Sequence, residues 1–249
     1  MKWFLFSGGR LLLEKHADGT YSVPESPEWC EGWHKISDIH HFDGFATAEI
    51  TTDDDTTLFP LRKTYFLLDS QTYNQAAKCE EIVYWDRNTQ YCSVCGGKMH
   101  QHTAISKCCN SCGREVWPLL STAIIVRITR GDEILLVHAK TFRHDFYGLV
   151  AGFVETGETL EEAVEREVME ETGLTIKNIQ YFASQSWPYP CGLMIGFTAE
   201  YDSGVIRLQE DELEKGGWFT KDNLPNIPDK ASIARRLIDD WLDSSPILS

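Results

Sequence analysis

The sequence lacks both an excess of positive charge and a long hydrophobic run. Its 23 lysines and arginines are outnumbered by 38 aspartates and glutamates, which gives a formal net charge of −15. Phosphate backbones and anionic membranes are bound by net basic faces, so this balance argues against a general nucleic-acid or membrane surface. No apolar run approaches the length of about 18 residues that a membrane-spanning helix needs.

The first residues also lack the pattern of a secretory signal. An apolar patch begins at Trp3, but Gly8, Gly9 and Arg10 interrupt it too early for the apolar core of a signal peptide. We therefore expect a soluble, cytoplasmic protein without a membrane partner. Eight cysteines would suggest disulfides in a small secreted chain, which a chain of 249 residues is not. Cys30 and Cys79 have no neighbour at ligand spacing and are interpreted as ordinary thiols.

The first third of the chain predicts a small domain of mixed structure. Residues 1–88 combine short apolar runs with turn-like and acidic interruptions; the runs are Trp3–Phe6, Leu11–Leu13 and Tyr65–Leu68. This pattern is typical of a strand-rich α+β domain. Its function cannot be inferred from the pattern alone.

Two cysteine pairs follow, in residues 89–116. Cys92 and Cys95 are separated by two residues, and after thirteen more residues Cys109 and Cys112 repeat that spacing. A glycine follows each pair and permits a tight turn under a metal, so four thiolates can converge on a structural Zn²⁺ in a zinc ribbon. Cys108, paired with Cys112, is a competing ligand, although the spacing favours Cys109. Zinc ribbons often bind nucleic acid, but the basic residues here are too few for a strong footprint.

The pattern changes again in residues 117–249, where we predict an α/β domain. Apolar runs predict a mixed sheet, and an amphipathic helix closes the domain. The predicted strands are Ala123–Ile128 and Ile134–Val137 around a turn at Arg130–Asp132, then Tyr147–Val154, Ile176–Phe182, Leu193–Tyr201 and Trp218–Phe219, and the helix spans 233–241.

An acidic helix is the most informative stretch of this domain. Thr159 and Glu162 have capping-box spacing, and Gly173 suits a left-handed C-cap, so a helix is predicted at about residues 159–172. Its apolar face contains Leu160, Ala163, Val164 and Val168. Glu167 and Glu171 fall in the middle of that face, and Glu170 lies at its edge.

Carboxylates on a core-facing stripe require compensation. They repel one another and lose hydration, at a cost of several kcal/mol unless cations or hydrogen bonds offset it. Mg²⁺ or Mn²⁺ prefers such oxygen ligands and also suits a phosphate substrate. Arg166 lies four residues from both Glu162 and Glu170, so it can tie the helix together. A solvated acidic face is the alternative, but it explains Glu167 and Glu171 poorly.

The whole motif resembles the Nudix box. Its fixed positions are Gly152, Glu158, Arg166–Val168, Glu170, Glu171, Gly173 and Leu174. The resemblance implies an α/β/α sandwich with a mixed sheet and metal-dependent hydrolysis of a nucleoside diphosphate linked to another group.

A second motif indicates the substrate. The loop Ser184–Pro190, SQSWPYP, is stiffened by Pro188 and Pro190, so Trp187 and Tyr189 could serve as stacking faces, or simply be buried in a turn. The loop resembles the SQPWPFPxS signature of NADH pyrophosphatases within the Nudix superfamily. Ser186 replaces a proline, Tyr189 replaces phenylalanine, and Gly192 replaces the last serine. The order of N-terminal domain, zinc ribbon, Nudix box and loop is also that family's architecture.

The resemblance implies further site residues. Glu212 would complete the metal site of Glu167, Glu170 and Glu171, and the backbone carbonyl of Ala151 would also contact a metal. The implied substrate-binding residues are Arg62, Trp117, Gln185, Ser186, Trp187, Pro188, Tyr189, Pro190, Cys191, Gly192 and Ala234. Arg166 and the three box glutamates would form the catalytic group. The resemblance also suggests a homodimer.

The predicted activity is that of an NAD(H) pyrophosphatase, a hydrolase that acts on an acid anhydride. Two or three Mg²⁺ or Mn²⁺ ions would activate a water for in-line attack, and Glu170 or Glu171 would orient or deprotonate it. The products would be NMN(H) and AMP. Members of the family also remove NAD caps from RNA 5′ ends. The alternatives are the same chemistry on ADP-ribose or dinucleoside polyphosphates, and a non-enzymatic zinc-ribbon module that binds nucleic acid.

Overall fold

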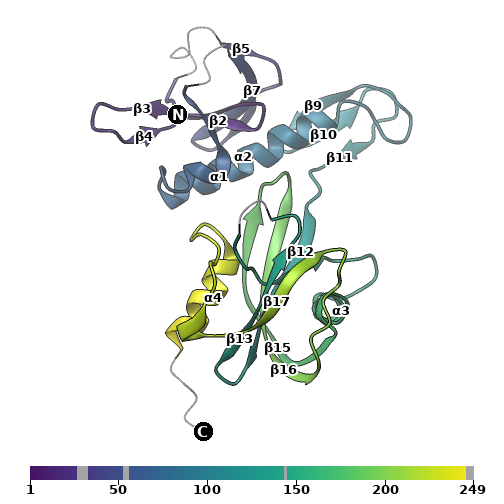
Figure 1. Cartoon of the computed structure of the whole chain (residues 1–249). Helices are drawn as coiled ribbons and strands as arrows, with labels where there is room; N and C mark the ends of the chain where they lie inside the picture. The colour runs from purple at the N-terminus through teal and green to yellow at the C-terminus, as the bar shows by residue number, and fades with distance from the viewer. Residues whose placement is uncertain (27–32, 53–55, 143–144, 245–249) are drawn as a thin grey trace. The chain divides into compact units, whose positions relative to one another are not determined.

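The chain folds into two compact units (Figure 1). The computed structural model describes residues 1–26, 33–52, 56–142 and 145–244, so Cys30 lies outside the described residues. The first unit comprises residues 1–120 with residues 186–191, and the second comprises residues 121–185 with residues 192–249. The predicted divisions after residues 88 and 116 stay predictions. Among the described residues, no helix is both long and apolar enough to cross a membrane.

A mixed sheet and a long helix form the core of the first unit. The sheet order is β5-β7-β1-β2-β8, with β6 beside β7; β1 pairs parallel with β7 and antiparallel with β2. The strands are β1 (Lys2–Ser7), β2 (Arg10–Leu12), β5 (Trp33–Lys35), β6 (His40–Phe42), β7 (Phe45–Thr52) and β8 (Leu58–Pro60). A separate hairpin joins β3 (Glu14–Lys15) to β4 (Tyr21–Ser22). The sequence therefore predicted the strand-rich α+β class correctly.

The long helix α2 (Ser70–Asn88) was not predicted as an element. It follows the short helix α1 (Leu61–Thr64), and the apolar run Tyr65–Leu68 lies in the turns between them. Asp69 caps α2 by accepting from the Thr72 N–H at 2.9 Å. The face of α2 that packs on Phe4 and Phe6 includes small and polar residues as well as apolar ones. Its apolar periodicity is therefore weak.

The cysteine region forms a three-stranded sheet in the order β11-β10-β9. Its strands are β9 (Met99–Thr103), β10 (Ser106–Cys109) and β11 (Glu115–Val116). A buried ion pair ties this sheet to α2, because the Lys107 ammonium lies 2.7 Å from the Asp86 carboxylate and is only 2% exposed. Burial alone would raise the pKa of Asp86, but hydrogen bonds from His40 and Lys107 lower it. The ribbon thus belongs to the same compact unit as the N-terminal sheet.

The second unit contains the predicted mixed sheet, in the order β15-β16-β12-β13-β17, with β14 beside β12. Its strands are β12 (Ser121–Arg130), β13 (Glu133–Ala139), β14 (Val150–Phe153), β15 (Leu174–Trp187), β16 (Gly192–Gly204) and β17 (Leu213–Thr220). β12 pairs antiparallel with β13 around the predicted turn and parallel with β16. The strand predicted from Tyr147 begins only at Val150.

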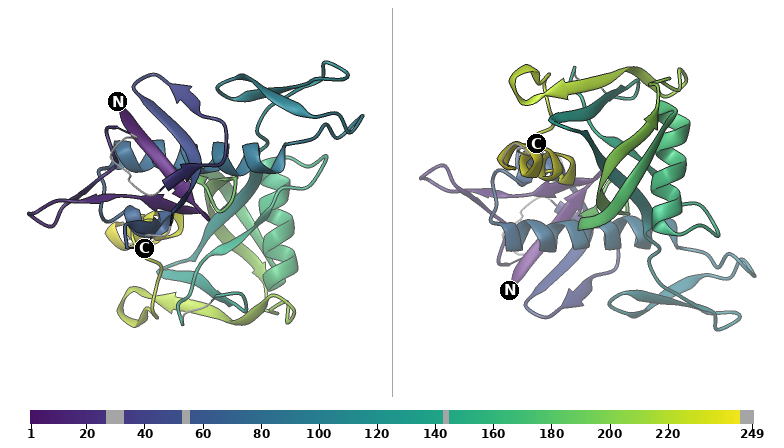
Figure 2. Two further views of the ribbon diagram at one scale, coloured as in Figure 1. Left: turned by 90° about the horizontal axis from the view of Figure 1, so that it is seen from above. Right: turned by 90° about the horizontal axis from the view of Figure 1, so that it is seen from below.

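Two helices cover opposite faces of this sheet (Figures 1 and 2). Ile124 and Val126 of β12 pack with the apolar face of α3 (Leu160–Thr172), while the intervening Ile125 packs with α4 (Ile233–Asp243). Alternate strand residues point to opposite faces, so one strand supports both layers. A single turn of 3-10 helix, η2 (Lys221–Asn223), follows β17. The predicted α/β/α sandwich is confirmed.

Candidate active site

The helix α3 begins and ends as the sequence predicts. The Thr159 hydroxyl accepts from the Glu162 N–H, and the Glu162 carboxylate accepts in return from the Thr159 N–H at 2.7 Å. Gly173 adopts the left-handed conformation of a C-cap, with φ of 70°. Ala163, Val164 and Val168 are fully buried. These local interactions fix the rotation of the helix about its axis and thereby the direction of its glutamates.

Arg166 is the centre of the acidic cluster. Its guanidinium donates two hydrogen bonds to Glu158, at 2.7 and 2.9 Å, in a bidentate pair. One of its nitrogens also donates to Glu167 at 2.9 Å and to Glu170 at 3.1 Å. The expected pairing with Glu162 is wrong, because that carboxylate closes the capping box instead. The hydrogen bonds from Arg166 lower the pKa of Glu158 to about 2, so Glu158 stays charged.

Gly152 of β14 provides the space for the Glu167 carboxylate. A Cβ atom at this glycine would lie 2.0 Å from both Cδ and Oε1 of Glu167. No side chain larger than hydrogen fits there unless the carboxylate moves. The carboxylate therefore rests against the β14 backbone, next to Ala151, which pairs with Ile125 of β12.

Glu171 is the buried member of the cluster. It is only 5% exposed, and within the described part of the chain no basic side chain forms an ion pair with it. Burial, and then the charge of Glu167, raise the pKa of Glu171 to about 8. The pKa of Glu167 is also raised, by burial first, although its bond to Arg166 counteracts the shift. The Glu170 side chain is 53% exposed, which agrees with its predicted position at the edge of the helix's apolar face.

A loop that is hydrogen bonded to the C-terminal end of α3 brings Glu212 close to Glu171. The backbone N–H of Arg207 donates to the Thr172 carbonyl at 2.8 Å, and that of Gln209 donates to the Glu171 carbonyl at 2.9 Å. These bonds satisfy carbonyl groups that the helix itself leaves unpaired. Three residues after Gln209, Glu212 is exposed and close enough for its charge to raise the pKa of Glu171.

The carboxylate cluster fits hard divalent cations. It offers only oxygen donors, and no basic side chain of the described residues forms an ion pair with the buried Glu171, a combination that Mg²⁺ or Mn²⁺ would stabilise. Among the described residues, the carboxylates do not converge as closely as the four cysteine sulfurs do.

The four predicted zinc ligands do converge. The sulfurs of Cys92, Cys95, Cys109 and Cys112 all lie within 4.8 Å of one another. The Cys92–Cys112 distance is 3.8 Å and the Cys95–Cys109 distance is 3.5 Å, close to the separation of about 3.8 Å around a tetrahedral zinc. Cys108, the competing ligand, points its thiol at the Gly113 carbonyl instead.

The turns beneath the cysteines have matching geometry. The Gly96 N–H donates to the Cys92 carbonyl at 2.9 Å, and the Gly113 N–H donates to the Cys109 carbonyl at 3.0 Å. Both glycines have positive φ, of 70° and 72°, which other residues rarely adopt. Backbone N–H groups of Cys112 and Ser111 lower the pKa of the Cys109 thiol to about 6, which favours the thiolate that binds zinc. The cluster is thus compatible with zinc.

Residues 186–190 of the aromatic loop belong to the first unit and contact its helices. The Arg62 guanidinium lies 5.4 Å from the centre of the Trp187 ring, so these two predicted substrate residues are brought together. Trp187 and Tyr189 meet edge to face, with ring centres 5.1 Å apart. Pro188 is buried, and Pro190 is exposed.

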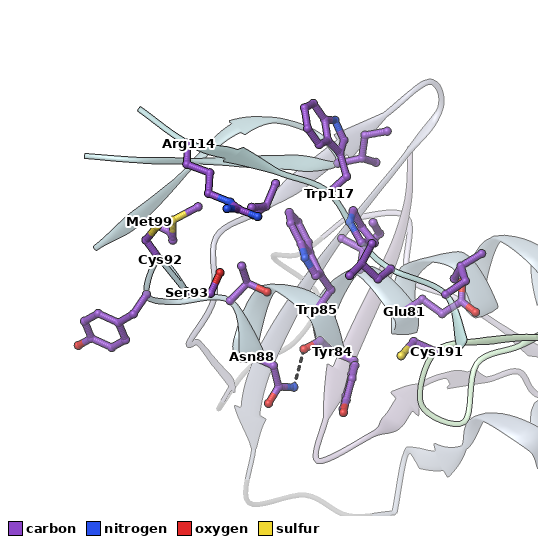
Figure 3. A pocket seen from close by; sticks show the side chains of 18 of the residues that line it. Glu81, Tyr84, Trp85, Asn88, Cys92, Ser93, Met99, Arg114, Trp117 and Cys191 are labelled. Carbon is purple, nitrogen blue, oxygen red and sulfur yellow. Dashed lines mark hydrogen bonds between the residues drawn. The ribbon is translucent and has the colours of Figure 1, made fainter. Parts of the chain in front are cut away.

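Trp117 and Cys191 line a cavity of about 610 Å³ in the first unit (Figure 3). Other walls come from α2, including Glu81 and Trp85, and from the ribbon. Trp117 is 52% exposed, so its ring is available to a ligand. The cavity therefore joins two predicted substrate residues that are far apart in the sequence.

Three other predicted substrate residues, Gln185, Gly192 and Ala234, lie in the second unit. Gln185 donates to the Ala231 carbonyl at 2.9 Å, three residues before Ala234 on α4. Gly192 is buried at the start of β16, where it pairs with Ser121 of β12. Gln185 and Ala234 are thus brought to the same region, at the beginning of α4.

Several residues of this site had no assigned role in the sequence. Glu158 belongs to the box. Its bidentate pair with Arg166 joins residues eight positions apart, a separation at which simple helical periodicity predicts no contact. Tyr73 and Glu81 contact the aromatic loop from more than 100 residues away in sequence. No local signal could have identified them.

Comparisons with known proteins agree with this geometry. A family model described as NUDIX domain matches residues 118–241. The NAD-capped RNA hydrolase NudC of Pseudomonas aeruginosa is 43% identical over 185 residues, which cover 74% of this chain and 66% of that protein. The NAD-capped RNA hydrolase NudC of Chromobacterium violaceum is 36% identical over 243 residues, covering 95% of this chain and 90% of that protein.

A solved structure resembles the fold. The crystal structure of a NUDIX hydrolase from Nitrosomonas europaea aligns with a TM-score of 0.50 at 20% identity, over 62% of this chain and 90% of that chain. The chain spans slightly less than two thirds of the Pseudomonas relative and nine tenths of the Chromobacterium relative. From the box, the aromatic loop and these relatives, the chain belongs to the NADH pyrophosphatase (NudC) family of Nudix hydrolases.

Proposed function

We propose that this protein hydrolyses the pyrophosphate bond of NAD(H) and releases NMN(H) and AMP. The same bond links NAD to the 5′ end of a capped RNA, so NAD-capped RNA is a second substrate of the same chemistry. The observation that carries the proposal is the buried Glu171, which has no ion-pair partner among the described residues and lies next to Glu167. The relatives named as NAD-capped RNA hydrolases support the choice of substrate.

In this proposal the cluster residues hold the metal ions, orient the attacking water and position one another. Glu167, Glu170, Glu171 and Glu212 hold Mg²⁺ or Mn²⁺, together with the Ala151 carbonyl. When bound, these ions would supply the positive charge that neutralises the pyrophosphate oxygens and activates a water for in-line attack. Glu170 or Glu171 orients or deprotonates that water. Arg166, fixed by Glu158, aligns Glu167 and Glu170.

The first unit contributes substrate binding and a structural metal. Trp187 stacks against one ring of the dinucleotide, and the adjacent Arg62 offers a positive charge to its phosphates. Cys92, Cys95, Cys109 and Cys112 hold Zn²⁺, which stabilises the ribbon. The family resemblance further supports a cytoplasmic homodimer.

A substrate panel tests the proposal. The protein is assayed with NADH, NAD⁺, NAD-capped RNA, ADP-ribose and a dinucleoside tetraphosphate, each with Mg²⁺ or Mn²⁺. We expect kcat/KM for NAD(H) or the capped RNA to exceed the values for ADP-ribose and the dinucleoside polyphosphate. Higher kcat/KM values for ADP-ribose or the dinucleoside polyphosphate would contradict the proposed substrate but not the proposed hydrolysis of a pyrophosphate bond.

A matched pair of variants tests whether the cluster is the catalytic site. Glu171→Gln should remove turnover, whereas Glu165→Gln, on an exposed position of the same helix, should leave it nearly unchanged. Equal activity of the two variants would show that the buried cluster is not where catalysis occurs.

A further inference from the structure

Two hydroxyl groups of the aromatic loop are hydrogen bonded to α2. The Ser186 hydroxyl donates to the Glu81 carboxylate at 3.1 Å, and the hydroxyls of Tyr189 and Tyr73 lie 2.9 Å apart. Tyr73 is only 7% exposed, and Tyr189 packs against the apolar cluster that contains it. The second bond is therefore partly shielded from competing water.

Ser186 and Tyr189 are also two of the positions at which the loop departs from the SQPWPFPxS signature. Proline and phenylalanine, the signature residues, carry no hydroxyl and could form neither bond. Both substitutions thus add a hydroxyl, and each added hydroxyl has a partner on the same helix. The loop and α2 are therefore joined by hydrogen bonds at two positions where the loop differs from the signature.

The two bonds flank the stacking residue. Tyr73 and Glu81 are eight residues apart, a rise of about 12 Å along a helix. Ser186 and Tyr189 lie on either side of Trp187 and Pro188, so the helix holds the loop before and after the indole. A proline restricts its own backbone without any partner, whereas serine at position 186 leaves φ free. A bond from the serine side chain to Glu81 can supply the lost restriction.

We propose that Tyr73 and Glu81 are positioning residues that fix the aromatic loop and hold the Trp187 ring against Arg62 for substrate binding. The inference rests on the proposed function for its kinetic consequence. In this chain, hydrogen bonds to α2 replace the rigidity that the signature obtains from proline. Neither residue touches the reacting atoms, so both act on KM rather than on kcat.

Double-mutant cycles test this arrangement. Tyr73→Phe should raise KM for NADH by about 2- to 10-fold, the effect of one hydrogen bond, with kcat within about 2-fold of wild type. Tyr189→Phe should have a similar effect, and the two effects on KM should be less than additive in the double variant. Glu81→Ala should raise KM in the same range, and Glu81→Gln, which retains an acceptor oxygen, should restore it. In a Ser186→Pro background, which lacks the hydroxyl, the effect of Glu81→Ala on KM should be smaller than in the wild-type background.

A readout without turnover separates the two proposals. Hydrogen exchange of the peptide that covers the loop should become faster in Tyr73→Phe and Glu81→Ala, and should stay unchanged in Asn74→Ala, on an exposed position of α2. If the wild-type protein does not cleave NADH, the proposed function is wrong. The hydrogen-exchange rates of the loop peptide then decide by themselves whether Tyr73 and Glu81 position the loop. Unchanged exchange in both variants, or an undiminished Tyr73→Phe effect on KM in the Tyr189→Phe background, overturns the inference.

Discussion

Replacing Gly152 by alanine should disable the metal site while the fold survives. The new Cβ would lie 2.0 Å from Cδ and Oε1 of Glu167, whereas real Cβ contacts essentially never fall below 3.0 Å, so the carboxylate must move by about 1 Å or more. Mg²⁺–oxygen bonds are only about 2.0–2.1 Å long. A displacement of 1 Å in a catalytic group can reduce turnover by about 100-fold, and we expect at least that loss in kcat.

The cost in stability should be smaller, because the displaced group is the end of a flexible side chain. Overpacking of this kind costs about 1–3 kcal/mol in the free energy of unfolding. Gly217→Ala is the matched control, since a Cβ at that glycine meets no atom within 4 Å. Turnover is measured with NADH at saturating Mg²⁺, and stability is measured by urea unfolding.

A double variant identifies the cause of the loss. In a Glu167→Ala background there is no carboxylate to displace, so Gly152→Ala should reduce kcat by less than about 3-fold. Wild-type kcat in Gly152→Ala, or full additivity with Glu167→Ala, would refute the argument that this glycine serves to seat Glu167.

Three further outcomes are expected. The pKa of Glu171 in the folded state, about 8, exceeds its ordinary value of 4.5, so between these pH values the folded state binds one more proton than the unfolded state. The free energy of unfolding, measured with urea in the absence of Mg²⁺ or Mn²⁺, should therefore fall as pH rises from about 5 to 8. Glu171→Gln should flatten that dependence. Cys92→Ser should lose zinc by mass spectrometry and melt at a lower temperature, whereas Cys108→Ser should change neither, because Cys108 lies outside the sulfur cluster. Trp187→Ala should raise KM for NADH roughly 5- to 150-fold, equivalent to about 1–3 kcal/mol of lost stacking, and an unchanged KM would remove Trp187 from the binding site.

The parts of the structure that depend on neighbouring residues could be predicted from the sequence. The bounds of α3 follow from the capping box at Thr159 and the left-handed Gly173, and both are local interactions. The sulfur cluster likewise follows from two short turns with equal spacing. In each case the residues that decide the geometry lie within a few positions of one another.

The parts that depend on distant residues could not be predicted. The proximity of Glu212 to α3 arises from hydrogen bonds between a loop and the last carbonyls of the helix. No spacing of residues in the sequence predicts these hydrogen bonds. The contact between Tyr73 and Tyr189 joins residues 116 positions apart. The helix α2 escaped prediction because residues such as Thr72 and Asp86 share its buried face.

The identity of the broken bond is the most direct test of the account. Metal ions on Glu167 and Glu171 would stabilise charge on pyrophosphate oxygens and would not assist cleavage of the nicotinamide–ribose bond. The reaction is run with NADH and Mn²⁺ in ¹⁸O-labelled water, and the products are weighed by mass spectrometry. We expect NMNH and AMP, with a single ¹⁸O on the phosphate of one of them. Free nicotinamide with ADP-ribose, or no cleavage of NADH with any divalent metal, would contradict the account.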